Sequence, residues 1–140
     1  MTFVYFTDRD LGNRFPEILK SAGVTVEQHK DHFASNAPDE EWLAGVSAHG
    51  WIALTRDRRI RYKPNELNAV IRHRVALLVI IGAAPHADLA RAFVKTLPRI
   101  ERFLSRQELP FIAKVYRPSP AETARRTDAP GRIELWYPPR

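Results

Sequence analysis

Short β-type runs alternate with helical stretches along most of the chain, and this alternation constrains the fold more than any other feature of the sequence. The clearest run is VALLVII at 75–81, a continuous apolar segment typical of a strand buried inside a sheet. Shorter runs of the same kind lie at 2–6, 24–28, 51–55 and 110–118. Helical spacing of apolar residues is found at 11–23, 39–50, 65–74 and 86–107, where Pro98 is expected to interrupt the last helix. The pattern predicts an α/β fold with a mainly parallel central sheet and crossover helices.

The end of the chain has a different composition. Residues 119–140 read SPAETARRTDAPGRIELWYPPR and are rich in proline, alanine and arginine. We therefore expect a main domain over 1–118 and a C-terminal extension over 119–140. The extension should be loose over 119–131 and should end in an edge strand over 132–137.

Composition excludes several classes of protein. The chain has 140 residues, of which 44% are hydrophobic and 27% charged, as in ordinary soluble globular proteins. It has no cysteine, so disulfides and thiolate metal sites are excluded and any metal must be held by oxygen or imidazole. The longest apolar run, at 75–84, is too short to span a bilayer, and the N-terminus lacks the pattern of a signal peptide. We expect a soluble, cytoplasmic protein with no membrane partner.

Positive charge is concentrated near the middle of the chain. The formal net charge is +6 at pH 7. The segment ALTRDRRIRYKP at 53–64 carries five basic residues around a single aspartate, Asp57: Arg56, Arg58, Arg59, Arg61 and Lys63. Such clustering suggests an anionic partner such as nucleic acid, although a solvated basic loop is the alternative.

Acidic residues stand at the ends of predicted strands or at the start of a predicted helix. Asp8 follows the first run, with Asp10 two residues on, Asp57 follows the run at 51–55, and Asp39 and Glu40 open the helix at 39–50. Loops after parallel strands and helix N-termini meet at one edge of such a sheet, so these carboxylates should converge. A cluster of like charges is costly unless a divalent cation neutralises it, and an all-oxygen donor set favours Mg²⁺ or Mn²⁺.

Each acid also has a purely structural reading. Asp10 could be the N-cap of the helix expected to begin at Leu11, and Asp39 with its neighbours could cap and charge-match the following helix. Asp57 could pair with the arginines around it.

Three segments together resemble the PIN-like nuclease domains, in the branch that includes the VapC-type toxins. They are FTDRDLGNRFPEILKSAG (6–23), HKDHFASNAPDEEWL (29–43) and GWIALTRDRRIRYKPNE (50–66). The resemblance implies a three-layer α/β/α sandwich and a divalent-metal endoribonuclease. Its catalytic acids would be Asp8, Asp39 and Asp57, with Glu40 sharing in metal binding. The fourth acid of the family is matched less closely, and Glu66 is the candidate for it.

The resemblance also implies partners. RNA would be the substrate, held by Arg56, Arg58, Arg59, Arg61 and Lys63. A cognate antitoxin would be the protein partner, with a homodimer or a toxin–antitoxin hetero-oligomer as the assembly. Two alternatives stay open at this point: a PIN-like domain that binds RNA or a partner without catalysis, and a structure-specific DNA nuclease.

Overall fold

Six strands form one central sheet, as seen in a computed structural model that describes residues 2–139. The strand order is β2-β1-β3-β4-β5-β6. The strands are β1 (Val4–Thr7), β2 (Thr25–Gln28), β3 (Ile52–Thr55), β4 (Ala76–Ile81), β5 (Phe111–Tyr116) and β6 (Arg132–Tyr137). The first five strands are parallel to one another, whereas β6 pairs antiparallel with β5.

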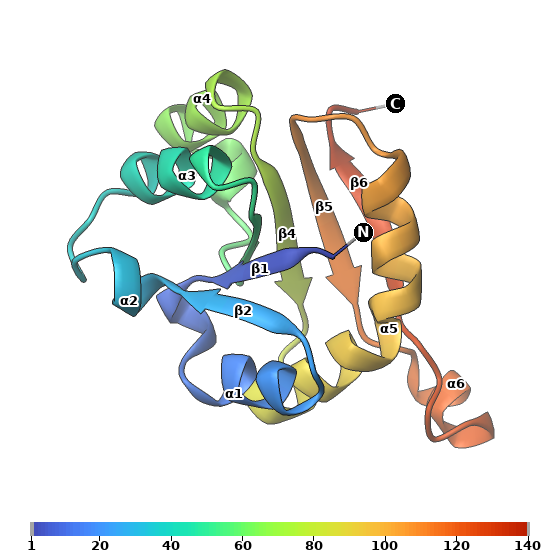
Figure 1. The fold of residues 1–140 in the computed structure, drawn as a ribbon. Coiled ribbons are helices and arrows are strands. Elements are labelled where there is room, and N and C mark those ends of the chain that lie inside the picture. The colour runs from blue at the N-terminus through green and yellow to red at the C-terminus, as the bar shows by residue number, and fades with distance from the viewer. Residues whose placement is uncertain (1, 140) are drawn as a thin grey trace.

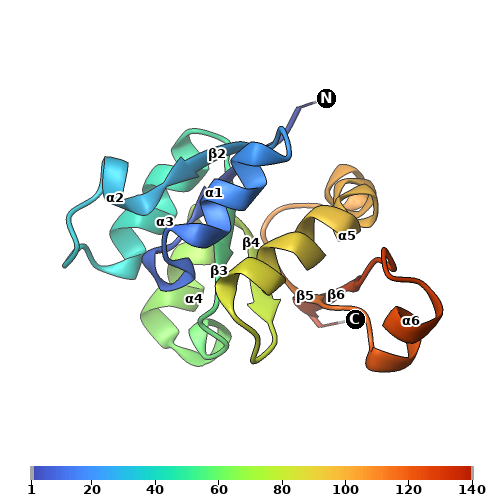
Figure 2. The same cartoon turned by 90° about the horizontal axis from the view of Figure 1, so that it is seen from below.

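Helices cover both faces of this sheet (Figure 1). They are α1 (Arg14–Ser21), α2 (His29–His32), α3 (Asp39–Ala48), α4 (Pro64–Arg72), α5 (His86–Arg106) and α6 (Pro120–Arg125), with short 3₁₀ turns η1 (Arg9–Leu11) and η2 (Ile60–Tyr62). Figures 1 and 2 show α3 and α4 on one face and α1 and α5 on the other. The predicted α/β/α sandwich with a mainly parallel sheet is therefore confirmed.

Alternation along the strands sends neighbouring side chains into two separate cores. In β1, Tyr5 packs with α1 and α5, whereas Phe6 packs with α3 and α4. The central strand β4 does the same: Leu78 belongs to the first core and Leu77 to the second, and both are fully buried. A strand buried on both faces needs apolar residues at every position, which explains its continuous run.

Three local predictions need correction. The helix expected over 11–23 begins at Arg14, because Gly12 has a φ of 66° and ends η1 before α1 starts. The polar connector at 29–38 contains the one-turn helix α2. The segment expected to be loose contains α6, where Ser119 and Glu122 form a reciprocal capping box.

The long helix α5 is not broken at Pro98. It is one helix from His86 to Arg106 with Pro98 inside it, and it changes direction along its length (Figures 1 and 2). A proline removes one backbone hydrogen bond and bends a helix, but buried residues on both sides, such as Phe93 and Ile100, hold α5 on the sheet.

The C-terminal segment joins the same sheet. β6 covers 132–137 at the edge of the sheet, and Ile133 and Leu135 pack on the first core. Arg99 on α5 donates to the carbonyl of Gly131 at 2.8 Å, which ties the approach to β6 to the main domain. None of the helices within residues 2–139 has the length and apolar character needed to cross a membrane.

Candidate active site at the carboxyl ends of β1 and β3

The sheet reverses its winding between β1 and β3. The chain passes from β1 outward to β2 and then returns to the other side of β1 to form β3. Loops on either side of such a switch point diverge and leave a crevice at the carboxyl ends of the strands. Asp8 follows β1 there, and its N–H donates to the carbonyl of Leu54 in β3 at 2.9 Å. This pairing brings two segments nearly fifty residues apart together.

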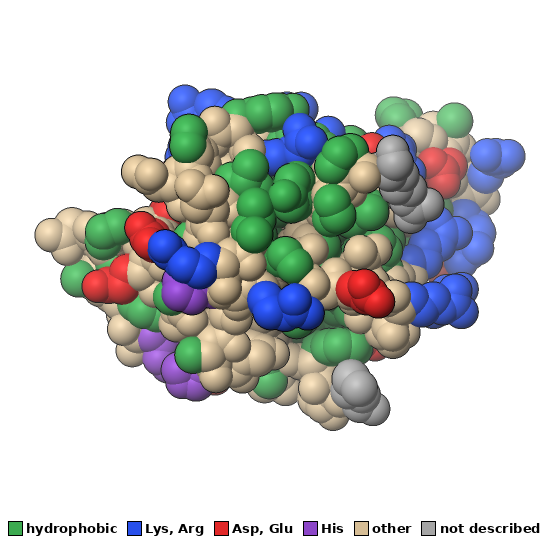
Figure 3. Space-filling view, turned by 90° about the horizontal axis from the view of Figure 1, so that it is seen from above, with side chains coloured by type: hydrophobic (Ala, Val, Ile, Leu, Met, Phe, Trp, Pro, Cys, Tyr) green, Lys and Arg blue, Asp and Glu red, His purple; other side chains and the backbone are tan. Residues whose placement is uncertain are grey.

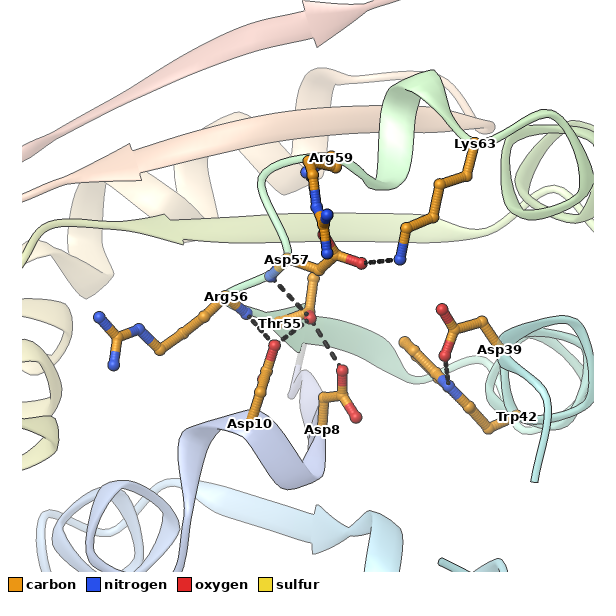
Figure 4. A network of polar contacts seen from close by, with 9 residues as sticks. All are labelled: Asp8, Asp10, Asp39, Trp42, Thr55, Arg56, Asp57, Arg59 and Lys63. Atoms are coloured by element: carbon orange, nitrogen blue, oxygen red, sulfur yellow. Dashed lines mark hydrogen bonds and ion pairs between the residues drawn. The ribbon is translucent and has the colours of Figure 1, made fainter. Parts of the chain in front are cut away.

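Two aspartates share one buried hydroxyl in this crevice (Figure 4). Thr55 Oγ1 lies 2.8 Å from Asp8 Oδ2 and 2.9 Å from Asp10 Oδ2, and Thr55 is fully buried. Asp10 also accepts from the N–H of Arg56 at 2.9 Å, and Asp8 accepts from the N–H of Arg9 at 2.7 Å. A hydroxyl has one hydrogen and can donate to only one carboxylate at a time, so the two acids compete for it.

This crowding disfavours the ionised forms of Asp8 and Asp10. Burial raises the pKa of Asp8 above its usual range, and hydrogen bonds from Thr55 and Arg9 offset only part of that effect. Burial and then the charge of Asp8 raise the pKa of Asp10 to about 6. Two partly desolvated carboxylates beside each other form a site that a cation would stabilise.

Asp57 joins the cluster from the loop after β3. Its N–H donates to Thr55 Oγ1 at 3.2 Å, and its Oδ2 accepts from Lys63 Nζ at 2.5 Å. Partial burial opposes ionisation of Asp57, but hydrogen bonds from Lys63 and from the N–H of Arg59 outweigh it and hold the pKa below its usual range. The partner of Asp57 is therefore mainly Lys63, while Arg59 Nε lies at 3.9 Å.

The two acids that open α3 lie differently. Asp39 lines the same cavity as Asp8, and its Oδ1 accepts from Trp42 Nε1 at 2.9 Å. Glu40 instead forms an ion pair with Arg72 of α4 on the surface and does not line this cavity. Glu66 is also absent from the lining, although its charge acts on Lys63. The structure thus brings Asp39, but neither Glu40 nor Glu66, to the crevice.

Basic side chains surround this acidic cavity, whose volume is about 630 Å³. It is lined by Asp8, Asp10, Asp39 and Asp57 together with Arg56, Arg58, Arg59 and Lys63. Arg56 donates to the carbonyl of Gly82 at 3.0 Å, and Arg59 is largely exposed. Arg61 is not part of the lining, because its side chain turns toward the aromatic residues of β6. Four of the five predicted RNA-binding residues therefore meet at this cavity.

A second, smaller cavity adjoins Asp8 on the β2 side. It measures about 190 Å³ and is lined in part by Asp8, Arg9, His29 and Lys30. Arg9 Nε donates to His29 Nδ1 at 2.9 Å, and burial lowers the pKa of His29, so both the contact and the burial favour the neutral imidazole. Asp8 therefore stands between two polar cavities.

Basic side chains also gather away from the crevice. In Figure 3, Lys and Arg side chains collect toward the side of the molecule where α5 lies. Arg99, Arg102 and Arg106 line a cavity near the end of that helix. Net charge alone therefore does not single out one surface for an anionic partner. The acidic cavity differs from this second group of cations because it combines acids and bases.

The donor chemistry of the acidic cavity fits a hard divalent cation, since every candidate ligand is an oxygen. Within residues 2–139, however, no three acidic or histidine side chains are placed so that they could hold a metal together. Lys63 occupies one oxygen of Asp57, and Trp42 occupies one oxygen of Asp39. The acids are gathered in one cavity, and two of them have local partners.

Sequence reasoning missed two members of this cluster. Asp10 was noted two residues after Asp8 but was not among the predicted site residues, because it could also cap a helix; α1 starts four residues later, and the side chain turns to Thr55 instead. Thr55 looked like the last residue of a strand. The sequence did contain a signal for Thr55, because a hydroxyl at the carboxyl end of a central strand stands next to the crevice of a parallel sheet.

Comparison with known proteins identifies the family. A model described as "PIN like domain" matches residues 3–82, which is more than half of the chain. The chain belongs to the PIN-like domain family. It is also 29% identical over 121 residues to the putative ribonuclease VapC45 of Mycobacterium tuberculosis (strain ATCC 25618 / H37Rv), an alignment that covers 79% of this chain and 84% of that protein. No solved structure matches the chain significantly.

The matched region contains the whole acidic cavity. Asp8, Asp10, Asp39 and Asp57 all lie within residues 3–82, as do the basic residues of its rim. The resemblance read from the three sequence segments is confirmed at the level of the family. The roles of individual residues in this PIN-like domain remain predictions.

Proposed function

We propose that this PIN-like domain is an endoribonuclease that depends on Mg²⁺ or Mn²⁺, hydrolyses RNA phosphodiester bonds and acts as the toxin of a type II toxin–antitoxin pair. The observation that carries the proposal is the acidic cluster on Thr55 at the switch point of the sheet, in a cavity rimmed by cations. Family membership and the similarity to a putative VapC ribonuclease support the same activity.

The carboxylates of the cluster are the proposed metal ligands. The carboxylates of Asp8 and Asp10 contact the hydroxyl of Thr55, the backbone N–H of Asp57 donates to the same hydroxyl, and Asp39 lines the cavity from α3. Bound divalent ions would supply a polarised phosphodiester, an activated water and charge stabilisation of the leaving oxygen. We retain Asp8, Asp39 and Asp57 as the catalytic acids and propose Asp10 as a metal ligand in preference to Glu40, whose carboxylate is paired with Arg72.

Lys63 has two proposed tasks. Without substrate it neutralises Asp57, which keeps an otherwise repulsive cluster folded. With RNA bound, its ammonium can turn to a phosphate, because it stands on the same rim as Arg58 and Arg59. Phosphate contacts from this rim would position the backbone without reading its sequence.

The activity is tested by incubating the purified chain with matched RNA and DNA strands in Mg²⁺, in Mn²⁺ and in chelator. We expect cleavage of RNA that needs a divalent ion and is lost in Asp8→Ala and Asp57→Asn, with circular dichroism confirming the fold of both. Glu40→Gln is the matched control and should cleave like the wild type. Full activity of Asp57→Asn would contradict the site, and equal cleavage of DNA would favour a DNA nuclease.

Metal binding is tested separately by calorimetric titration with Mn²⁺. Binding should be strong in the wild type and weaker in Asp10→Asn. Absence of binding even with RNA present would favour a PIN-like domain that binds RNA or a partner without catalysis.

The toxin role is tested in cells. Expression of the wild type should arrest bacterial growth, whereas Asp57→Asn should not. We expect a small DNA-binding protein, encoded by the neighbouring gene, to restore growth. It should bind this chain in the cytoplasm and co-purify with it as a hetero-oligomer. Growth arrest by Asp57→Asn would separate toxicity from the proposed chemistry.

A further inference from the structure

A cluster of cations and aromatic rings is built around η2, whose next residue, Lys63, lines the acidic cavity. We call it the stacking patch and define it by Arg61, Tyr62, Lys114 and Trp136. Arg61 Cζ lies 5.5 Å from the ring centre of Tyr62 and 5.7 Å from that of Trp136. Lys114 Nζ lies 4.2 Å from the ring centre of Trp136. The rings of Tyr62 and Trp136 meet edge to face, with their centres 5.6 Å apart.

Two distant parts of the chain build this patch. Arg61 and Tyr62 come from η2, directly after the basic loop, whereas Trp136 comes from the edge strand β6. The pairing of β5 with β6 has a bulge: Ala113 faces Leu135 and Ile112 faces Tyr137, so Trp136 is the extra residue. A bulge redirects the side chain of the inserted residue, and here it places Trp136 against η2.

The cations of the patch are held mainly by aromatic faces. Within residues 2–139, Arg61 has no acidic partner, and its buried Nε has no hydrogen-bond partner. The acid opposite Lys114 in the sheet is Glu134, and its carboxylate oxygen Oε2 lies 3.9 Å from the guanidinium of Arg132. A guanidinium held by cation–π contacts keeps its full charge, so the patch attracts anions.

The patch also offers an open aromatic surface. Tyr62 is 65% exposed although its ring also contacts that of Trp136. The next residue, Lys63, lines the acidic cavity, so the cavity and the patch are continuous along the chain. Exposed aromatic rings beside cations are the elements from which proteins build sites for single-stranded nucleic acid.

We propose that the stacking patch binds an unpaired base of the RNA strand where the strand leaves the acidic cavity, with Tyr62 as the stacking ring. The inference rests on the proposed function and adds to it a base-binding subsite outside the acidic cavity, built on Tyr62. Arg61 then contacts RNA outside the cavity, and no base identity is read, because every base presents a face for stacking. A protein partner would also cover an exposed tyrosine, but a polyanion fits better because the patch continues along the chain into the basic rim and its cations lie against aromatic rings.

The test measures binding without cleavage. Wild type and variants are titrated, in chelator, with a fluorescent oligouridine RNA and with an oligomer of the same length made of abasic ribonucleotides. Tyr62→Leu should weaken binding of oligouridine by about 5- to 150-fold, the range expected for one stacked base, and leave binding of the abasic oligomer unchanged. Tyr62→Phe keeps the ring and should bind both oligomers like the wild type.

Arg59→Gln serves as the control for charge. It removes a cation from the rim of the cavity and should weaken both oligomers alike. The proposal is overturned if Tyr62→Leu binds oligouridine like the wild type, or if it weakens both oligomers equally. Loss of antitoxin binding with unchanged RNA binding would also overturn it and make the patch a protein-binding surface. Because cleavage is not needed, a chain that stacks bases but does not cut RNA would refute only the nuclease proposal.

Discussion

Replacing Asp10 with asparagine should stabilise the folded chain at neutral pH and at the same time abolish RNA cleavage. Asn keeps an acceptor for the N–H of Arg56 and for the hydroxyl of Thr55, the two groups that Asp10 contacts. It removes one of two carboxylates that compete for that hydroxyl. Functional clusters of this kind are commonly held together at the expense of stability.

The magnitude follows from the pKa of Asp10, which is raised from 3.8 to about 6, first by burial and then by the charge of Asp8. A difference of about two pKa units corresponds to about 3 kcal/mol in the absence of solvent screening. Asp10 is exposed as a residue, so water screens much of this effect and we expect about 1 kcal/mol at pH 7. This gain should raise the melting temperature by about 3 °C.

The sign of the pH dependence is fixed by the direction of the shift. The folded chain keeps a proton on Asp10 to higher pH than the unfolded chain does, so the wild type loses stability as the pH rises from about 4 to about 6. Asn does not titrate. The advantage of Asp10→Asn should therefore be absent near pH 4, grow through this window and stay constant above it.

The assay is urea unfolding in chelator at several values between pH 4 and pH 8. Asp88→Asn is a matched control, because Asp88 is an exposed acid in the first turn of α5 and makes only a surface contact with Arg91. Adding Mg²⁺ should stabilise the wild type more than Asp10→Asn. A destabilised Asp10→Asn at pH 7, or a gain of equal size at pH 4, would refute the reasoning.

Three further substitutions test other parts of the structure. Lys63→Met should destabilise the fold by about 1 kcal/mol at pH 7, because it removes the ion pair with Asp57. This loss of stability should shrink below about pH 4, as Asp57 becomes protonated, and urea unfolding at both pH values measures the difference. Glu40→Gln breaks only a surface ion pair and should change the free energy of unfolding by less than about 0.5 kcal/mol, so a larger loss would mean that Glu40 has a structural task. Gly131→Ala should destabilise the whole domain by about 2 to 3 kcal/mol, because a Cβ at this position would lie 1.7 Å from the carbonyl oxygen of Tyr116. A melting temperature like that of the wild type would show that β6 is not integral to the fold.

The sequence predicted the elements of the fold with useful accuracy because their signals are local. Apolar runs and helical spacing located all five parallel strands and the four longer helices, mostly within a few residues of their ends. The two helices that were missed, α2 and α6, are four and six residues long. α6 had a readable signal in Ser119 and Glu122, a capping pair that the Pro- and Arg-rich composition obscured.

The site was predictable in part for the same reason. Asp8 and Asp57 were expected at the cavity that they line because they come just after strands, a position that places side chains at the edge of a parallel sheet. Asp39 and Glu40 were not separated, because neighbours on a helix differ by about 100° in direction and only the packing of α3 decides which faces the cavity. Arg61 was grouped with the rim by its place in the sequence, whereas its rotamer depends on aromatic residues some 75 positions later.

The sequence by itself determined the layered architecture, the oxygen-only donor set and the placement of acids after strands, since these depend on residue type and short-range periodicity. Tertiary structure decided which of those acids meet. Strand order places β3 beside β1, so Thr55 comes to lie between Asp8 and Asp10, and pairing with β5 brings Trp136 to Tyr62. Such contacts arise from the pairing of distant strands and from packing of the whole core, which no local stretch of sequence encodes.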